Sequence, residues 1–301
     1  MRGVYPAARL HACVVLTDTV PARSHTTLHA LTALVMGAFA ANSVLARLAL
    51  TTTAIDAATF TAVRLVAGAV MLLLVVRLRR GTVGGSWASG AALFVYAAAF
   101  SFAYLALSAG TGALLLFGAV QLTMIGWGLA QGEGFKLGQT IGLVVAVSGL
   151  VYLLLPGLAA PPPVPAALMA AAGMAWGVYS LRGRGATDPA GVSAGNFVRA
   201  ALLSLGLGLV ALLVPGVARP PDGLGLTYAV LSGAVTSGLG YVLWYRVLPS
   251  LRATSAATVQ LSVPVLAALG GTLLIGEAVT LRLVVAAVAI LGGIALVLRG
   301  R

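Results

Sequence analysis

Ten apolar segments follow one another along this chain, and each is long enough to cross a lipid bilayer. A membrane helix needs about 20 mostly apolar residues. The connections, such as RLRRGTVGG and PGVARPPDG, are rich in glycine, proline and charge, as is typical of loops. The sequence therefore predicts an all-α integral membrane protein with ten transmembrane helices. The predicted helices cover roughly residues 28–48, 57–76, 88–107, 111–131, 137–155, 164–181, 191–214, 224–246, 253–275 and 279–298.

The composition excludes a soluble domain and a nucleic-acid partner. Hydrophobic residues make up 60% of the chain and charged residues only 8%, whereas about 25% of a soluble domain is charged. The net charge is +12, but the basic residues are scattered between apolar runs and form no nucleic-acid motif. Because Cys13 is the only cysteine, an intrachain disulfide is excluded and a cysteine metal site is disfavoured. We expect membrane lipids and a small molecule as partners, with no cofactor and no metal.

The basic residues also predict the orientation of the chain. If the N-terminus is cytoplasmic, Arg219 and Arg282 lie outside and most remaining Lys and Arg lie inside. The positive-inside rule then places both termini in the cytoplasm, in the inner (plasma) membrane. Residues 1–27 are interpreted as a flexible cytoplasmic tail or an over-long start, because Arg9 and His11 interrupt any signal-peptide core. The inside set is Arg2, Arg9, Arg23, Arg77, Arg79, Arg80, Lys136, Arg182, Arg184, Arg246, Arg252, Arg299 and Arg301.

The two halves of the chain share an ordered pattern. GAVQLTMIGWGLAQGE (118–133) aligns with SVPVLAALGGTLLIGE (262–277), and MGAFAANSVLAR (36–47) aligns with GMAWGVYSLRGR (173–184). The second helix of each half carries an arginine, Arg64 or Arg199. This common order predicts two five-helix repeats, at 28–155 and 164–299. Since five is odd, the second copy enters the membrane inverted, a design typical of secondary transporters with substrate sites near the midplane.

These features resemble a known family. The ten spans, the paired Gly-Glu, the WGVYS motif and QLSVPVLAALGGTLLIGE are similar to the EamA-like branch of the drug/metabolite transporter superfamily. The resemblance covers about residues 28–299 and is strongest in the second half. Val120 stands where many members carry a proline. The resemblance implies a ten-helix inverted-repeat transporter, commonly an exporter of amino acids, related metabolites or toxic compounds.

Polar residues within spans are the first candidates for substrate contacts, because polar groups in hydrocarbon usually face the bundle interior or a wet cavity. Gln121 and Gln260 lie near mid-span, where we favour cavity lining over an interhelical hydrogen bond worth about 0.6–2 kcal/mol. Arg64 and Arg199 can attract a carboxylate, although capping of carbonyls or snorkelling is slightly favoured. The full set is Asn42, Arg64, Gln121, Asn196, Arg199 and Gln260.

Pro264 follows Gln260 by four residues, so it removes the helical hydrogen bond to the Gln260 carbonyl. We predict a kinked gating helix with a substrate contact at Gln260; the alternative is a static kink satisfied by a neighbouring helix. Tyr96 belongs to an aromatic stripe, and Trp176 and Tyr179 share one helix face. These three aromatic residues are candidates for substrate binding, with plain helix packing as the alternative.

Several function classes are disfavoured by missing motifs. The sequence has no polar catalytic cluster for a membrane enzyme, no channel filter and no ATP-binding loop. No carboxylate or histidine lies deep in a span, which favours facilitated diffusion or exchange over proton coupling. Gly138 and Gly142 form a GxxxG pair that serves either internal packing, which we favour, or a homodimer. We predict a non-enzymatic transporter that exports small metabolites by alternating access, with an enzyme or channel-like facilitator as the alternative.

Overall fold

The computed structural model describes residues 25–132, 134, 136–157, 160–183, 186–214, 219–247 and 259–299. Within these ranges the chain is a helical bundle without strands. Eight of its helices are long and apolar enough to cross a membrane. Residues 1–24 of the predicted tail lie outside the described ranges, as do Glu133 and Arg184 of the aligned motifs.

The helices of the two halves overlap the segments that hydropathy predicts. The first half contains α1 (His25–Thr52), α2 (Ala57–Leu78), α3 (Trp87–Ala103), α4 (Ala109–Ala130) and α5 (Leu137–Leu154). The second half contains α6 (Pro163–Arg182), α7 (Pro189–Leu213), α8 (Gly223–Val230), η1 (Leu231–Leu239), α9 (Gly240–Val247), α11 (Ser262–Ile275) and α12 (Leu281–Arg299).

The segments α8, η1 and α9 form one continuous span, but α3 and α11 are each shorter than a full span. The helix α3 has 17 residues and α11 has 14. At 1.5 Å per residue, α11 is about 21 Å long, less than the hydrocarbon thickness of about 30 Å. The remainder of the predicted segment 253–275 falls partly on residues outside the described ranges.

Capping side chains fix several helix starts at the ends of the bundle. Asp56, Asp188 and Asp222 accept backbone N–H groups at the starts of α2, α7 and α8. Ser86 and Ser108 do the same for α3 and α4. Such caps satisfy donors that a helix start leaves unpaired. Three of the four described carboxylates are therefore used at helix ends.

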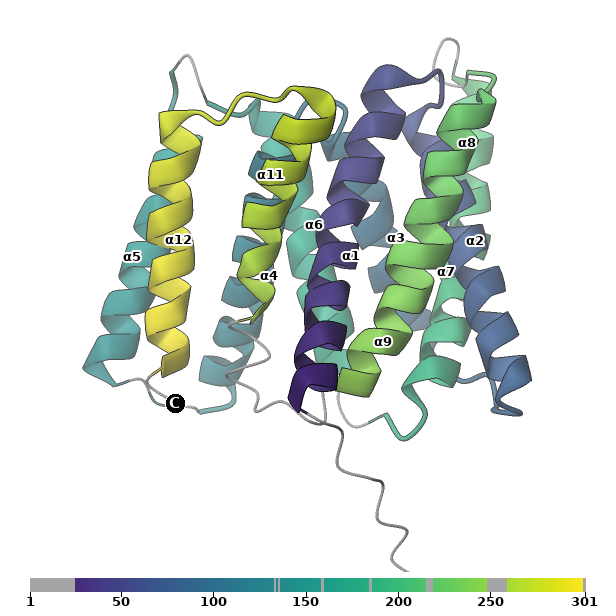
Figure 1. The fold of residues 1–301 in the computed structure, drawn as a ribbon, viewed down its shortest axis with the longest axis horizontal. Helices are drawn as coiled ribbons and strands as arrows, with labels where there is room; N and C mark the ends of the chain where they lie inside the picture. The colour runs from purple at the N-terminus through teal and green to yellow at the C-terminus, as the bar shows by residue number, and fades with distance from the viewer. Residues whose placement is uncertain are drawn as a thin grey trace, which may run out of the picture.

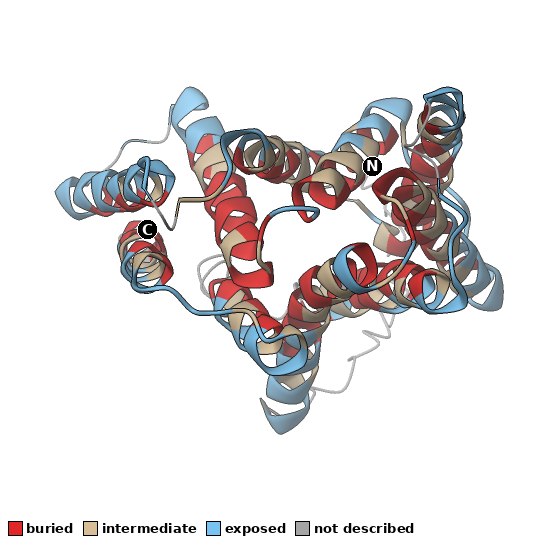
Figure 2. Cartoon of the chain, turned by 90° about the horizontal axis from the view of Figure 1, so that it is seen from above, coloured by how far each residue is buried: buried red, intermediate tan, exposed pale blue. Residues whose placement is uncertain are grey.

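The helices pack with their buried faces inward. Figure 2 shows buried residues on the inner sides and exposed residues on the outer sides of the bundle. The helices α5 and α12 pack together at one edge, and α2 packs on α7 at the other (Figure 1). The start of α1 and the end of α12 lie at the same end of the bundle (Figure 1). We call the opposite end, which carries the α1–α2 connection at residues 53–56, the upper end.

The GxxxG pair contributes to packing within the chain. A Cβ atom at Gly142 would lie 2.6 Å from the carbonyl oxygen of Gly293 in α12, so only glycine allows this approach. Gly138 has nothing within 4 Å of the same position. The α5–α12 contact thus uses Gly142, in line with the favoured interpretation of internal packing.

A π-helical segment interrupts the eighth predicted span. The segment η1 covers nine residues and continues α8 directly into α9. A Cβ atom at Gly233 would collide with the carbonyl oxygen of Arg64, so η1 approaches the α2 backbone closely. Ser232, Thr236 and Ser237 are all buried. Because π-helical turns are rare and occur frequently at functional sites, η1 marks a region to inspect for function.

Candidate functional site

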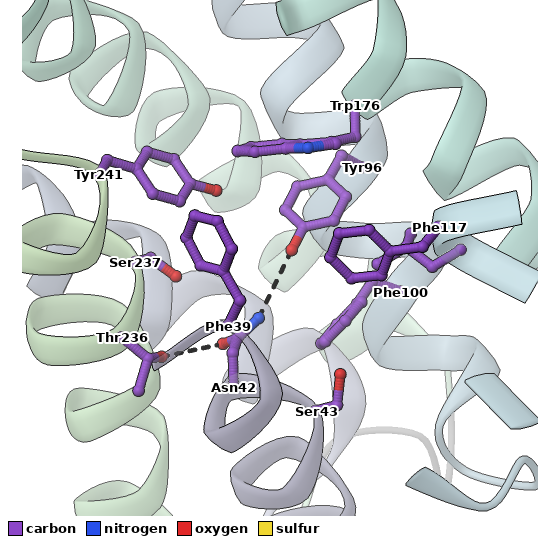
Figure 3. A pocket seen from close by; sticks show the side chains of 11 residues that line it. Phe39, Asn42, Ser43, Tyr96, Phe100, Phe117, Trp176, Thr236, Ser237 and Tyr241 are labelled. Carbon is purple, nitrogen blue, oxygen red and sulfur yellow. Dashed lines mark hydrogen bonds between the residues drawn. The ribbon is translucent and has the colours of Figure 1, made fainter. Parts of the chain in front are cut away.

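A central cavity lies between α1, α3, α4, α6, η1 and α9 (Figure 3). Most of its wall is aromatic, with amide and hydroxyl groups on one side. Its internal volume is about 20 Å³, which is room for little more than one water molecule. A cavity of this size is too small for a metabolite. Its lining residues are Phe39, Asn42, Ser43, Tyr96, Phe100, Leu116, Phe117, Trp176, Thr236, Ser237 and Tyr241.

Asn42 is the centre of the polar network beside this cavity. Its Oδ1 accepts hydrogen bonds from Ser232 Oγ at 2.7 Å and Thr236 Oγ1 at 3.2 Å. Its Nδ2 donates to the Tyr96 hydroxyl oxygen at 3.4 Å (Figure 3). Arg64 Nη2 donates to the same Oδ1 at 3.5 Å. One amide thus connects α1 with α2, α3 and η1.

Aromatic rings from five helices surround the rest of the cavity. The Trp176 ring centroid lies 5.0 Å from those of both Tyr96 and Tyr241. Phe39 meets Tyr241 edge-to-face at 6.1 Å. Tyr179 stacks on Trp176 at 5.4 Å and pairs with Asn196, but it is not part of the cavity lining. These rings form one contiguous aromatic cluster in the cavity wall.

Arg64 lies one layer behind the cavity wall. Its side chain is only 3% exposed, and its guanidinium carbon lies 4.7 Å from the Phe100 ring centroid and 5.6 Å from that of Tyr96. Arg64 Nη1 is buried and has no hydrogen-bond partner among the described residues. The structure thus brings Arg64 together with Asn42 and Tyr96, three of the predicted candidates.

Arg199 has a different environment. Its Nη1 donates to the carbonyl oxygens of Gly84 at 3.0 Å and Gly195 at 2.8 Å. Asn196 Oδ1 accepts the backbone N–H of Ser86 at 2.9 Å. Both side chains therefore hold the 81–86 loop and the start of α3 against α7. This arrangement fits the capping interpretation of Arg199.

Gln121, Gln260 and Pro264 lie outside the cavity lining. Gln121 is buried in α4, four residues after the lining residue Phe117. A turn at Leu261 separates Gln260 from α11, which begins at Ser262. Pro264 lies in the first turn of α11, where a missing N–H costs little. It lines a separate, apolar cavity of about 450 Å³ between α4, α11 and α12.

A second polar cluster closes the upper end of the bundle. Arg47 Nε lies 2.8 Å from Glu277 Oε1, the one ion pair among the described residues. Arg47 Nη1 also donates to the carbonyl oxygens of Tyr104 and Leu105. Glu277 Oε2 accepts the backbone N–H of Ala109 at 2.8 Å. The Arg47–Glu277 pair thus joins α1, the α3–α4 connection and the end of α11.

Sequence reasoning missed much of the cavity. Phe39, Ser43, Phe117 and Tyr241 look like ordinary apolar or small residues of a span, so nothing in the sequence distinguishes them. Thr236 and its neighbour Ser237 had a usable signal, since hydroxyl residues recur in LSGAVTSGL. Hydroxyls inside a span hydrogen-bond across helices, as Thr236 does to Asn42.

Comparisons with known proteins agree with this architecture. Residues 164–299 match the model of the EamA-like transporter family. This match assigns the second half of the chain to the EamA-like transporter family. Together with the apolar helices of the bundle, it makes the chain a multi-pass membrane protein and a transporter of the drug/metabolite type. The family is one of transporters rather than enzymes.

Two individual proteins are similar over most of the chain. The uncharacterized protein PA1977 of Pseudomonas aeruginosa is 56% identical over 274 residues, which is 90% of this chain and 94% of that protein. A crystal structure described only as that of a protein matches with a TM-score of 0.64 and 22% identity. The match covers 89% of this chain and 98% of the other, and it supports the fold alone.

The Asn42 network predicts a stability effect. Asn42→Ala removes the oxygen that Arg64, Ser232 and Thr236 share, which leaves Arg64 Nη2 and the Ser232 hydroxyl unpaired, while Thr236 keeps the Ser232 carbonyl as its acceptor. We expect the free energy of unfolding to fall by about 1–3 kcal/mol. Asn42→Asp keeps an acceptor and adds a counter-charge for Arg64, so its stability should equal or exceed wild type. Thermal unfolding in lipid nanodiscs measures both; an Asn42→Ala protein as stable as wild type would contradict the proposed network.

Proposed function

We propose that this chain is a secondary transporter that exports small metabolites, amino acids or toxic amphipathic molecules across the inner (plasma) membrane by alternating access. Ten spans in two inverted repeats form the framework, with both termini cytoplasmic and the upper end outside. The substrate binds in the central cavity, with Asn42, Tyr96 and Trp176 in its wall. The observation that carries the proposal is an aromatic and polar cavity enclosed where helices of both halves meet.

The packing of the helices supports an inverted repeat. The pair α1–η1 has its counterpart in α6–α3, α1–α11 in α6–α4, and α2–η1 in α7–α3. The pairs α2–α7, α4–α11 and α5–α12 join corresponding helices of the two halves. Exchanging the halves therefore leaves this set of contacts unchanged, as expected for a two-fold relation between the repeats.

Glycines in the corresponding helices support the same relation. Gly90 of α3 approaches Arg199, since a Cβ atom there would lie 2.7 Å from the Arg199 Cβ. Gly233 of η1 approaches the backbone of Arg64 in the same manner. Each half thus presents a glycine to the arginine of the other half. Rocking one half on the other about this interface is the movement that alternating access requires.

The size of the cavity supports a conformational cycle. Ligand pockets usually have volumes of about 300–1,000 Å³, far above the volume of this cavity. A metabolite enters only if the surrounding helices separate. At the upper end such separation has to break the Arg47–Glu277 pair, which joins helices from both halves. In this proposal, Gln121 and Gln260 contact the substrate and Pro264 takes part in gating when α4 and α11 move.

Transport in proteoliposomes tests the proposal. Purified protein should give saturable flux of at least one compound from a panel of amino acids, acetylated or aromatic relatives and cationic toxins. Trp176→Ala removes a wall of the cavity, so the KM should rise about tenfold, equivalent to about 1.4 kcal/mol of lost binding. Trp127→Ala is the matched control, because Trp127 is 53% exposed on the outer surface of α4. Absence of saturable flux, or equal effects of the two substitutions, would refute the assignment.

The Arg47–Glu277 pair predicts how access to the cavity is controlled. Glu277→Gln weakens the closure of the upper end, so a cysteine at Ser43 should react several-fold faster with an impermeant maleimide added outside cells. The experiment uses a background in which Cys13 is replaced by serine. Arg282→Gln is the control, because Arg282 lies at the same end and contacts the Pro156 carbonyl rather than the closure. Unchanged labelling in Glu277→Gln would show that the pair does not limit opening.

We also propose that two copies of this chain form a homodimer through α5. Gly142 is used within the chain, while Gly138 is exposed on α5. Any contact between copies through this helix would involve Gly138 and its exposed neighbours.

A further inference from the structure

We infer that the central cavity selects small solutes with one negative charge and a flat apolar body, such as aryl carboxylates, over zwitterions and cations. Arg64 is the residue that sets this preference. The inference rests on the proposed function, because it assigns the class of solute to the same cavity.

The first argument for this preference is that the positive charge of Arg64 is not balanced by a nearby carboxylate. Arg64 is almost completely buried, and its Nη1 has no hydrogen-bond partner among the described residues. The four described carboxylates all lie at helix ends, where Asp56, Asp188 and Asp222 cap helices and Glu277 pairs with Arg47. A buried cation without a nearby anion is costly, and removing that cost favours the binding of an anion. A solute with a negative charge can therefore balance the charge of Arg64.

The second argument is that Arg64 lies directly behind the residues that line the cavity. Three residues of the cavity wall contact its guanidinium: Asn42 by a hydrogen bond, and Phe100 and Tyr96 through their rings. Only this single layer separates the charge from a bound solute. In a medium of low dielectric constant a charge at that distance attracts an anion and repels a cation strongly. The ring faces compensate part of the buried charge, but they supply no net negative charge.

The other residues of the cavity wall determine which kind of body, attached to the negatively charged group, the cavity accepts. Trp176, Tyr241 and Phe39 form one cluster of contacting rings in the wall, as Figure 3 shows, and an aromatic body can stack on these rings once the helices that carry them separate. On the polar side the Ser237 hydroxyl can donate a hydrogen bond to a carboxylate, whereas the Thr236 hydroxyl already donates to Asn42 and the Ser43 hydroxyl pairs with Tyr104. No described carboxylate lines the cavity to hold an ammonium group. A zwitterionic amino acid therefore gains less here than a monoanion of the same shape.

A series of ligands with one phenyl body tests the charge preference. Phenylacetate, phenylacetamide, phenethylamine and phenylalanine present an anion, a neutral amide, a cation and a zwitterion. Their dissociation constants follow from the stabilisation of the purified full-length protein against thermal unfolding. We expect phenylacetate to bind at least tenfold more tightly than each of the other three. Equal affinities, a preference for phenethylamine or phenylalanine, or no binding by any of the four would overturn the inference.

Substitutions of Arg64 test whether this residue causes the preference for the anion. Arg64→Gln should bring the affinity for phenylacetate to within twofold of that for phenylacetamide, while the affinity for the amide stays at its wild-type value. Arg64→Lys should retain a preference for the anion. Arg282→Gln is the matched control, because Arg282 Nη1 is also buried without a described partner but lies at the peripheral α12. A preference that survives in Arg64→Gln would overturn the role of Arg64. If that variant does not fold, the wild-type series still decides on the preferred charge.

Flux measurements separate this inference from the proposed function. Saturable transport of phenyl compounds without regard to charge supports the transporter and overturns the anion preference. Tight, selective binding of phenylacetate without transport of any compound supports the anion site and overturns the proposed function.

Discussion

The buried guanidinium of Arg64 is the most demanding feature of this bundle. On insertion scales an arginine near the centre of a membrane helix costs about 2.5–3.5 kcal/mol, and no described carboxylate offsets it. The structure compensates with the Asn42 oxygen and the faces of Phe100 and Tyr96. Cation–π contacts of this kind contribute about 0.5–2 kcal/mol each. The positions of α1, α2, α3 and η1 relative to one another all depend on this arrangement.

The same arrangement explains why part of the cavity wall is polar and why the cavity is small. Asn42 holds two hydroxyl residues of η1, Ser232 and Thr236, next to the arginine. The π-helical backbone and Gly233 allow η1 to come close enough to α2 for these contacts. A solute that supplies a negative charge can take over part of the compensation for Arg64. In the proposed transport cycle, such binding favours a conformation in which the cavity walls separate, and this links substrate recognition to movement.

Hydropathy predicted the positions of the helices well, because the thickness of the bilayer fixes the length of an apolar segment. Asn42, Tyr96 and Trp176 were also predicted as site residues, since polar or aromatic groups in a span stand out against aliphatic neighbours. The π-helix had no comparable signal, because its composition is that of any small-residue segment. The Arg47–Glu277 pair joins residues 230 positions apart, and a sequence without structure does not bring them together. Glu277 pairs with this distant arginine rather than with Arg282, which is only five positions away.

Counterflow tests alternating access most directly. Proteoliposomes are preloaded with a transported solute at high concentration and diluted into medium with a trace of the same solute in labelled form. A carrier that exposes one site to each side in turn should accumulate the label transiently above its external concentration, because unlabelled solute occupies the inner-facing site and limits the return of the label. A channel-like facilitator allows only downhill equilibration. Transient uphill accumulation that disappears without preloading is the result we predict; simple equilibration at every preload concentration would contradict it.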